Sequence, residues 1–444
     1  MKMFLVFTLV LFLGSQSYAD TFNGIRKSSL SPVKIKTEQN GGANPAFFSD
    51  GSRLFGLYDG NDHVKIKSFE SFESPIEVSK IDITPYFSAK HEINVQPYPD
   101  PDFALFLLGN SRVLFFTAEG RDDGGKWLEK GFLFDLTDPL KPKELSAFSL
   151  SPIERVGHLT DVKIFEYQSR RILLLTASSY DTEDNIPAWF EILDFTVPGI
   201  PSRLYRSEFD RNNRISLGPT YQIPTGEVLQ SVSYMGAADI LLFGDLKNPR
   251  KITVPSSGVP CQRRSGQRFL PTPTSLLYME SCANYIPGSG LLSLDGYLRQ
   301  TDLTDLSNIR SSAENLQIHD LLYANAFGDK LLVILNYLTY NATNNSLALR
   351  TYEKSTKQET KLGDPMDQLE VFQSQGRNLV VAIGHREKTR YATLGEFNSK
   401  LEYVLLSRLP LGSEGISFRF TGPLSVGDRT LFVSRGESFE LTFP

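Results

Sequence analysis

The stretch Asp135-Leu-Thr-Asp-Pro139 follows a dense apolar strand, and its pattern recurs along the chain. The clearest copies are Asp194-Phe-Thr-Val-Pro198, Asp245-Leu-Lys-Asn-Pro249 and Asp302-Leu-Thr-Asp-Leu306, with weaker ones at 71–75, 353–357 and 396–400. An Asp at a strand end can accept hydrogen bonds from nearby backbone N–H groups, and proline presets a turn while ending ladder pairing. The pattern therefore predicts repeated hairpin tips in which the acidic residue has a structural role.

Apolar runs recur in step with these tips, at a spacing of roughly fifty to sixty residues. They begin at Leu54, Val113, Ile172, Val228, Leu276, Leu331, Leu379 and Leu431. Each unit is too small to bury its own apolar face, so consecutive units must pack on one another. We therefore predict an all-β fold, a single β-propeller with eight blades. Seven blades is the alternative, because the fourth unit is hard to divide into strands.

The segment Phe134 to Lys143 (FDLTDPLKPK) resembles the repeats of LVIVP-type β-propeller proteins, and Asp194 to Pro201 (DFTVPGIP) is similar. Phe48-Ser-Asp-Gly-Ser-Arg-Leu54 resembles the hairpin of TolB-type propeller repeats. The resemblances cover about a third of the chain. They imply the propeller fold and no particular activity.

Each unit divides into four strands. In the second unit we expect these at 103–108, 113–118, 128–134 and 143–148. The last unit supplies only Ile416 to Phe420, Thr430 to Ser434 and Ser438 to Phe443 before the chain stops. Its fourth strand is missing. We expect the alternating segment Pro32 to Thr37 to take that place at the outer edge of the last blade and close the ring.

The N-terminus predicts a secretory signal peptide over residues 1–19, followed by the propeller domain at 20–444. Lys2 precedes the apolar stretch Met3 to Leu13, and Ser17 and Ala19 are small residues at the positions that a signal peptidase reads. The apolar stretch is too short to span a bilayer, although a retained anchor is the alternative. We therefore expect a periplasmic or secreted protein with no membrane insertion after cleavage.

Composition limits the partners. Apolar residues make up 40% of the chain and charged residues 22%, which is ordinary for a globular protein. The formal charge of −5 is mixed along the chain without a basic stripe, so nucleic acid is not an expected partner. We expect a monomer that needs no cofactor.

Cysteine and histidine placement adds two hypotheses. Cys261 and Cys282 are the only cysteines, and in an exported chain they predict one disulfide. Cys282 is expected between the second and third strands of the fifth blade. Neither cysteine has the spacing of a metal site.

All five histidines fall on one predicted face. His158 and His319 are the candidates for acid–base chemistry at the channel mouth, and the alternative is that these are solvated loop histidines.

Trp127 and Trp189 precede or begin the third strand in neighbouring blades, beside acidic loops. The candidate binding residues are Trp127, Trp189, Asp122, Asp123, Asp181 and Asp184. An aromatic pair flanked by carboxylates suits a carbohydrate, a peptide or a cation, whereas packing of both rings in the blade rim is the alternative. Asp59-Gly-Asn-Asp62 is interpreted as a surface turn in preference to a calcium loop. Sequons occur at Asn341 and Asn344.

Two classes of function stay open. The chain lacks G-x-S-x-G, H-E-x-x-H and phosphate-cradling glycine loops, which favours a binding or scaffold module that presents its loop-rich top face to a protein or glycan. The alternative is a hydrolase or lyase at the mouth of the central channel, because propeller active sites assemble from separate blades and leave no local motif. The sequence does not decide whether the protein is an enzyme.

Overall fold

The computed structural model describes most of the strands and many of the turns. The described residues are 28–33, 46–71, 74–88, 93–96, 103–121, 125, 127–150, 159–177, 188–209, 216–222, 228–234, 237–254, 263–272, 274–285, 292–305, 308–316, 319–327, 330–337, 346–353, 356–363, 366–386, 389–413, 420–434 and 438–442. The expected signal peptide lies outside them.

The described strands group into eight sheets, numbered here in chain order. Sheet 1 contains β2 (Ala46–Ser49), β3 (Leu54–Asp59), β4 (His63–Ser71) and β5 (Ser74–Asp82). Sheet 2 contains β6 (Asn94–Gln96), β7 (Ala104–Leu108), β8 (Ser111–Arg121), β9 (Trp127–Asp135) and β10 (Lys143–Ser149). Sheet 3 contains β11 (Leu159–Tyr167), β12 (Arg170–Ala177), β13 (Ala188–Asp194) and β14 (Ser202–Phe209). Sheet 4 contains β15 (Ser216–Gln222), β16 (Val228–Tyr234), β17 (Ala237–Phe243) and β18 (Arg250–Val254).

The second half of the chain repeats this plan. Sheet 5 contains β19 (Arg263–Thr272), β20 (Ser275–Tyr285), β21 (Leu292–Asp302) and β22 (Arg310–Leu316). Sheet 6 contains β23 (His319–Phe327), β24 (Lys330–Tyr337), β25 (Ser346–Glu353) and β26 (Thr356–Gly363). Sheet 7 contains β27 (Met366–Ser374), β28 (Arg377–Arg386), β29 (Thr389–Phe397) and β30 (Tyr403–Ser413). Sheet 8 contains β31 (Phe420–Val426), β32 (Arg429–Ser434), β33 (Ser438–Thr442) and β1 (Ser29–Val33).

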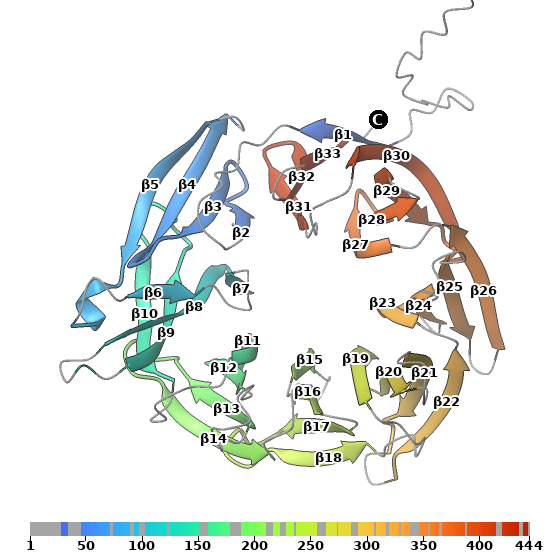
Figure 1. Cartoon of the computed structure of the whole chain (residues 1–444), viewed down its shortest axis with the longest axis horizontal. Coiled ribbons are helices and arrows are strands. Elements are labelled where there is room, and N and C mark those ends of the chain that lie inside the picture. The colour runs from blue at the N-terminus through green and yellow to red at the C-terminus, as the bar shows by residue number, and fades with distance from the viewer. Residues whose placement is uncertain are drawn as a thin grey trace, which may run out of the picture.

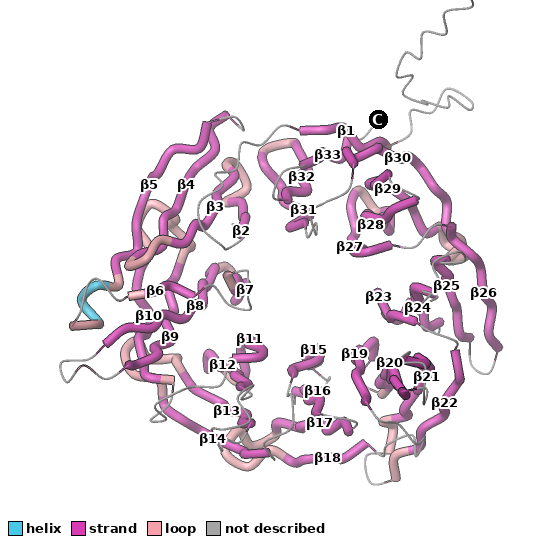
Figure 2. The backbone as a smooth tube through the Cα atoms, in the orientation of Figure 1, coloured by secondary structure: helices cyan, strands magenta, loops and turns pink. Residues whose placement is uncertain are grey.

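The sheets stand around a centre like the blades of a β-propeller (Figure 1). The innermost strands are β2, β7, β11, β15, β19, β23, β27 and β31. Neighbouring strands within each sheet pair antiparallel, as hairpins joined by short turns require. The described part is almost entirely strand and loop, with one short 3-10 turn at Thr84–Tyr86 (Figure 2). None of its helices is long and apolar enough to cross a membrane.

The strand next to the innermost one supplies much of the core. In β8, Val113, Leu114, Phe115 and Phe116 are all fully buried. Successive side chains point to opposite faces, and each face is covered by a neighbouring sheet. Leu114 and Phe116 pack with side chains of sheet 1, whereas Val113 and Phe115 pack with side chains of sheet 3. Each such side chain contributes about 2 kcal/mol by burial, so adjacent sheets stabilise one another.

The four clearest hairpin tips are confirmed, with the acidic residue as a hydrogen-bond acceptor in each. Asp135 Oδ1 accepts hydrogen bonds from Thr137 N at 2.8 Å and Thr137 Oγ1 at 2.5 Å. The Asp194 and Asp302 copies bind the threonine two positions later in the same way. In the weak copy at 396–400 the acceptor is Asn398, not the predicted Glu396, because the short amide reaches the Lys400 N–H two residues on.

The N-terminal strand pairs with the last strand of the chain, but its bounds differ from the expectation. β1 spans Ser29–Val33, upstream of the predicted 32–37, and runs antiparallel to β33 with Leu30 opposite Leu441. Leu30 is buried in the core of sheets 7 and 8, so this register places an apolar side chain inward. The part of the prediction at 34–37 lies outside the described residues.

The first strand of sheet 8 also differs from the prediction. β31 is Phe420–Val426, so the described strand continues six residues beyond the expected end at Phe420, while 416–419 lie outside the described residues. The Gly-Pro pair in the segment Thr421-Gly-Pro-Leu424 is typical of a turn. In the structure it is an irregularity within the strand, where the β31–β32 register shifts between Thr421 and Leu424.

Candidate functional site

Trp127 and Trp189 occupy equivalent positions in neighbouring sheets. The β8–β9 ladder ends at the pair Arg121 and Trp127, and the β12–β13 ladder ends at the pair Ala177 and Trp189. Sheets 2 and 3 share one buried cluster. The two connections that carry the acidic candidates, 122–126 and 178–187, therefore leave the same end of two adjacent sheets.

The Trp189 ring is an interior side chain, only 1% exposed. It lies in the cluster between sheets 2 and 3, and the Arg206 guanidinium sits 5.1 Å from its ring centroid. Trp189 is therefore packed inside the protein, as in the alternative to a ligand-binding role. Trp127 begins β9, as predicted, and its side chain lies outside the description.

An ion pair between the buried Glu191 and the half-exposed Arg203 joins the two strands β13 and β14 near Trp189. Glu191 is 2% exposed, and its carboxylate accepts a hydrogen bond from Arg203 Nε. Burial raises the pKa of Glu191, while the charges of Arg203 and Arg206 act in the opposite direction. Removing Arg203 would leave the charge of Arg206 to offset the burial of Glu191 without a hydrogen bond from Arg203.

Glu119 and Glu129 form a carboxylate pair that sequence reasoning did not identify. They are directly opposite in the β8–β9 ladder and so share a face of sheet 2. Burial, followed by the charge of Glu119, raises the pKa of Glu129 to about 8, against a smaller lowering by a hydrogen bond with Thr117. Only the register of the two strands reveals this pair, because ten positions separate the residues in sequence.

Several candidates lie wholly or partly outside the described residues. Those with no described position are Asp122, Asp123, Asp181, Asp184, His158 and Cys261. His319 begins β23, the inner strand of sheet 6, as predicted, and its side chain is not described. Cys282 lies within β20 opposite Asp295, so its expected place in a loop between strands is wrong. The ladder of β20 and β21 extends three residues further, to Tyr285 and Leu292.

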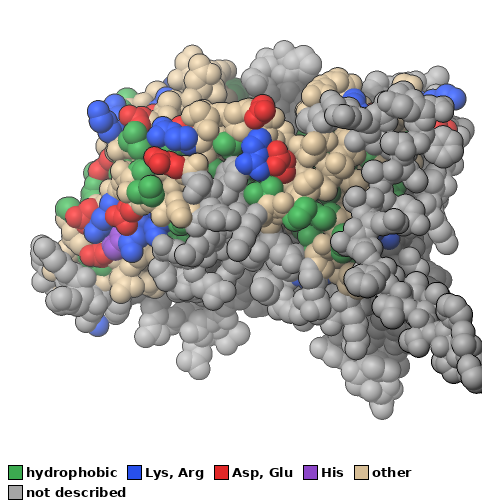
Figure 3. Space-filling model, turned by 90° about the horizontal axis from the view of Figure 1, so that it is seen from above, with side chains coloured by type: hydrophobic (Ala, Val, Ile, Leu, Met, Phe, Trp, Pro, Cys, Tyr) green, Lys and Arg blue, Asp and Glu red, His purple; other side chains and the backbone are tan. Residues whose placement is uncertain are grey.

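The Asp59 to Asp62 segment is a tight surface turn. Gly60 N donates to His63 O at 2.8 Å, and the Asp62 carboxylate contacts His63 Nδ1 at 2.5 Å. The hydrogen bond with His63 lowers the pKa of Asp62. Over the described residues no three His, Cys, Asp or Glu side chains are grouped to hold a metal ion. Figure 3 shows acidic and basic side chains interspersed over the described part of one side of the ring.

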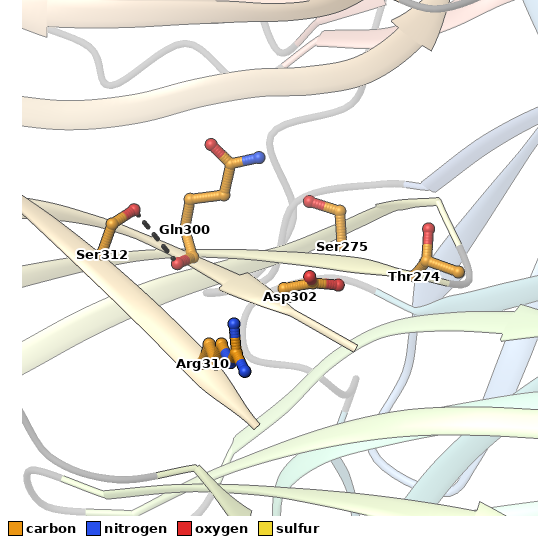
Figure 4. A pocket seen from close by; sticks show the side chains of 6 residues that line it. All are labelled: Thr274, Ser275, Gln300, Asp302, Arg310 and Ser312. Atoms are coloured by element: carbon orange, nitrogen blue, oxygen red, sulfur yellow. Dashed lines mark hydrogen bonds between the residues drawn. The ribbon is translucent and has the colours of Figure 1, made fainter. Parts of the chain in front are cut away.

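Two pockets among the described residues contain none of the candidate binding residues. One, of about 420 Å³, lies between sheets 2 and 3 and is lined in part by Phe148, Leu193, Ile200 and the Glu191–Arg203 pair. The other, of about 450 Å³, is polar and lies on sheet 5 (Figure 4). Its residues are Thr274, Ser275, Gln300, Asp302, Arg310 and Ser312.

No family model matches the chain. No curated protein matches it either. The resemblance to LVIVP-type and TolB-type repeats therefore stays a prediction about turn chemistry.

Solved structures give similarities of arrangement at low identity. The Dos1 propeller is 10% identical, with 94% of this chain and 95% of that chain covered and a TM-score of 0.47. Prolyl oligopeptidase B from Galerina marginata is 9% identical, with coverages of 92% and 55% and a TM-score of 0.43. A hypothetical selenium-binding protein from Sulfolobus tokodaii is 11% identical, with coverages of 83% and 91% and a TM-score of 0.36. The chain spans about half the length of the peptidases it matches.

Proposed function

We propose that this protein is an exported binding or scaffold propeller that presents one loop-rich end of its sheets to a protein or glycan partner. The proposal includes an eight-bladed ring in which β1 completes the last blade. Pairing of β1 with β33 supports this closure, because the two ends of the chain then share one sheet. A backbone hydrogen bond of 2.8 Å from Gly427 N to Gly51 O supports contact between the last sheet and sheet 1.

One observation supports this binding face: the β8–β9 pairing in sheet 2 and the β12–β13 pairing in sheet 3 end at equivalent positions. Trp127 and Trp189 mark the same end of sheets 2 and 3, so the connections bearing Asp122, Asp123, Asp181 and Asp184 begin at the same end of two adjacent sheets. With Trp189 buried, Trp127 is the aromatic contact in this proposal. The loop carboxylates supply acceptors for sugar hydroxyls or for the basic side chains of a protein.

Binding is proposed in preference to the hydrolase or lyase alternative. The sequence lacks the G-x-S-x-G and H-E-x-x-H motifs of hydrolases. The imidazoles of His158 and His319 lie outside the described side chains and do not bear on this choice. No described contact favours that chemistry.

The test is a capture experiment with matched variants. Immobilised mature protein is exposed to the extracytoplasmic fraction of its source and to a glycan array. Trp127→Ala and the double change Asp122→Asn with Asp123→Asn should remove the captured partner without lowering the melting temperature. Asp138→Asn is the control, because Asp138 lies in the same sheet at the opposite end and the amide can still accept the Leu140 N–H. Undiminished capture by both test variants would refute this face as the site.

A further inference from the structure

The polar pocket on sheet 5 lies at the end of the molecule opposite the proposed binding face. Thr274 and Ser275 lie at the turn from β19 to β20, and Asp302 ends β21. The connections that leave the proposed face start at the other end of these strands, where Tyr285 pairs with Leu292. The pocket therefore belongs to a separate site. Its volume of about 450 Å³ falls within the range of small-molecule sites.

Strand register places the polar side chains of this pocket on one face of the sheet. Ser275 pairs with Asp302, and Asp302 pairs with Arg310, so the three lie in a row across β20, β21 and β22. The next row on the same face contains Gln300 paired with Ser312. Figure 4 shows these side chains around one space.

The charged groups of the pocket balance one another. Asp302 Oδ1 accepts from Thr304 N at 2.9 Å and Thr304 Oγ1 at 2.8 Å, and these bonds, with Arg310 nearby, lower the pKa of Asp302. The carboxylate is therefore ionised at neutral pH. Arg310 is exposed and forms no ion pair within the described part of the chain. One acid and one base give no net charge, which favours a neutral ligand.

The hydroxyl of Ser275 is buried at the edge of this pocket. Its Oγ is inaccessible to solvent and has no hydrogen-bond partner among the described residues. A buried hydroxyl without a partner carries the desolvation penalty of an unmade hydrogen bond. Rotation of the Ser275 side chain about its Cα–Cβ bond would turn this hydroxyl toward the pocket that the residue lines, where a ligand hydroxyl would remove the penalty.

We propose that this pocket binds a single neutral sugar unit. Each sugar hydroxyl both donates and accepts, so it matches neighbouring donors and acceptors such as Arg310 and Asp302. The Gln300 amide and the Ser275 and Ser312 hydroxyls add mixed groups of the same kind. A zwitterionic amino acid would use the two charges and leave these neutral groups without a role.

The test is calorimetric titration of the full mature chain with glucose, galactose, mannose and N-acetylglucosamine. A dissociation constant in the millimolar range is expected for at least one sugar, as is usual for so small a ligand. Arg310→Ala should weaken binding roughly tenfold or more, as should Asp302→Asn, whose amide still caps the turn. Arg250→Ala is the control, because Arg250 is the exposed first residue of β18, the equivalent strand of sheet 4.

Melting curves establish that each variant is folded. No binding of any sugar in the panel, or equal binding by wild type and Arg310→Ala, would overturn the proposal. Binding of glycine or alanine with the same dependence on Arg310 would replace the sugar with a zwitterion. Arg310→Ala should lose sugar binding while its capture of the partner stays undiminished, which separates this site from the proposed partner face.

Discussion

Arg377 Nη1 donates a hydrogen bond of 2.7 Å to Ser28 Oγ, although 349 positions separate the two residues. The same guanidinium pairs with the Glu396 carboxylate at 2.6 Å. Next to Ser28, Leu30 N donates to Ser407 Oγ at 3.1 Å. The N-terminal strand is therefore held by sheet 7 as well as by its ladder partner β33.

Replacing Leu30 with Asp should destabilise the protein strongly. The side chain is buried among apolar residues of sheets 7 and 8, where an unpaired carboxylate is unfavourable. We expect the melting temperature to fall by about 5 °C or more. Pro32→Ala, at an exposed position of the same strand, is the control and should change it little. Equal melting of wild type and Leu30→Asp would contradict the role of β1 in closing the ring.

The sequence predicted four of the five strands of sheet 2 within a few residues, because long buried strands carry continuous apolar runs and Asp–Thr tips mark their ends. The three-residue β6 was missed, since it is too short to show a pattern. The bounds of β1 were harder to predict, because a short strand with alternating residues fits more than one register. Tertiary contact selects the register in which Leu30 is buried.

The candidate sites were less accessible to sequence reasoning than the fold. Glu119 and Glu129, or Ser275 and Arg310, approach one another only through strand pairing, which local sequence does not specify. For Trp189, the sequence predicted the correct strand but did not decide whether the ring packs in the core or contacts a ligand. Burial depends on the neighbouring sheet, and it favours packing for this ring.

Trp189→Ala should cost about 3–5 kcal/mol, because it leaves a cavity between sheets 2 and 3 that the surrounding strands cannot fill. Trp189→Phe should cost less, since a second aromatic ring keeps part of the volume. Chemical denaturation of the three proteins measures the difference. Val197→Ala is a suitable control, as that side chain is 75% exposed. A Trp189→Ala protein as stable as this control would show that the ring is not part of the core.

Thr196 joins two strands at its hairpin tip. Its hydroxyl donates to Asp194 Oδ1 at 2.6 Å and accepts from Arg171 N at 2.8 Å. Thr196→Ala should therefore lower the free energy of unfolding by about 1–2 kcal/mol, whereas Thr196→Ser should keep both bonds and most of the stability. If Ser and Ala variants unfold at the same denaturant concentration, the hydroxyl does not stabilise the tip.

The predicted disulfide can be tested without the positions of both sulfurs. Protein isolated from its extracytoplasmic compartment, denatured but not reduced, should react with essentially no thiol reagent. After reduction it should expose two thiols, from Cys261 and Cys282. Two reactive thiols before reduction would contradict the bond.

The carboxylate pair of sheet 2 predicts an unusual pH dependence of stability. The pKa of Glu129 is raised from an ordinary value of 4.5 to about 8, so the folded protein holds this proton more tightly than the unfolded chain. Between these values only the unfolded chain loses the proton as the pH rises. The contribution of Glu129 to stability is therefore complete below about pH 4.5 and declines up to about pH 8, by at most about 1.4 kcal/mol per pH unit.

Glu129→Gln should remove that decline, because its amide does not titrate. We expect the variant to match wild type near pH 4.5 and to be more stable at pH 9, measured by chemical denaturation at several pH values. Glu119→Gln is the companion variant. It removes the charge opposite Glu129 and should narrow the pH range of the decline by lowering the pKa of Glu129. Parallel stability profiles for wild type and Glu129→Gln over this range would show that Glu129 ionises normally in the folded protein.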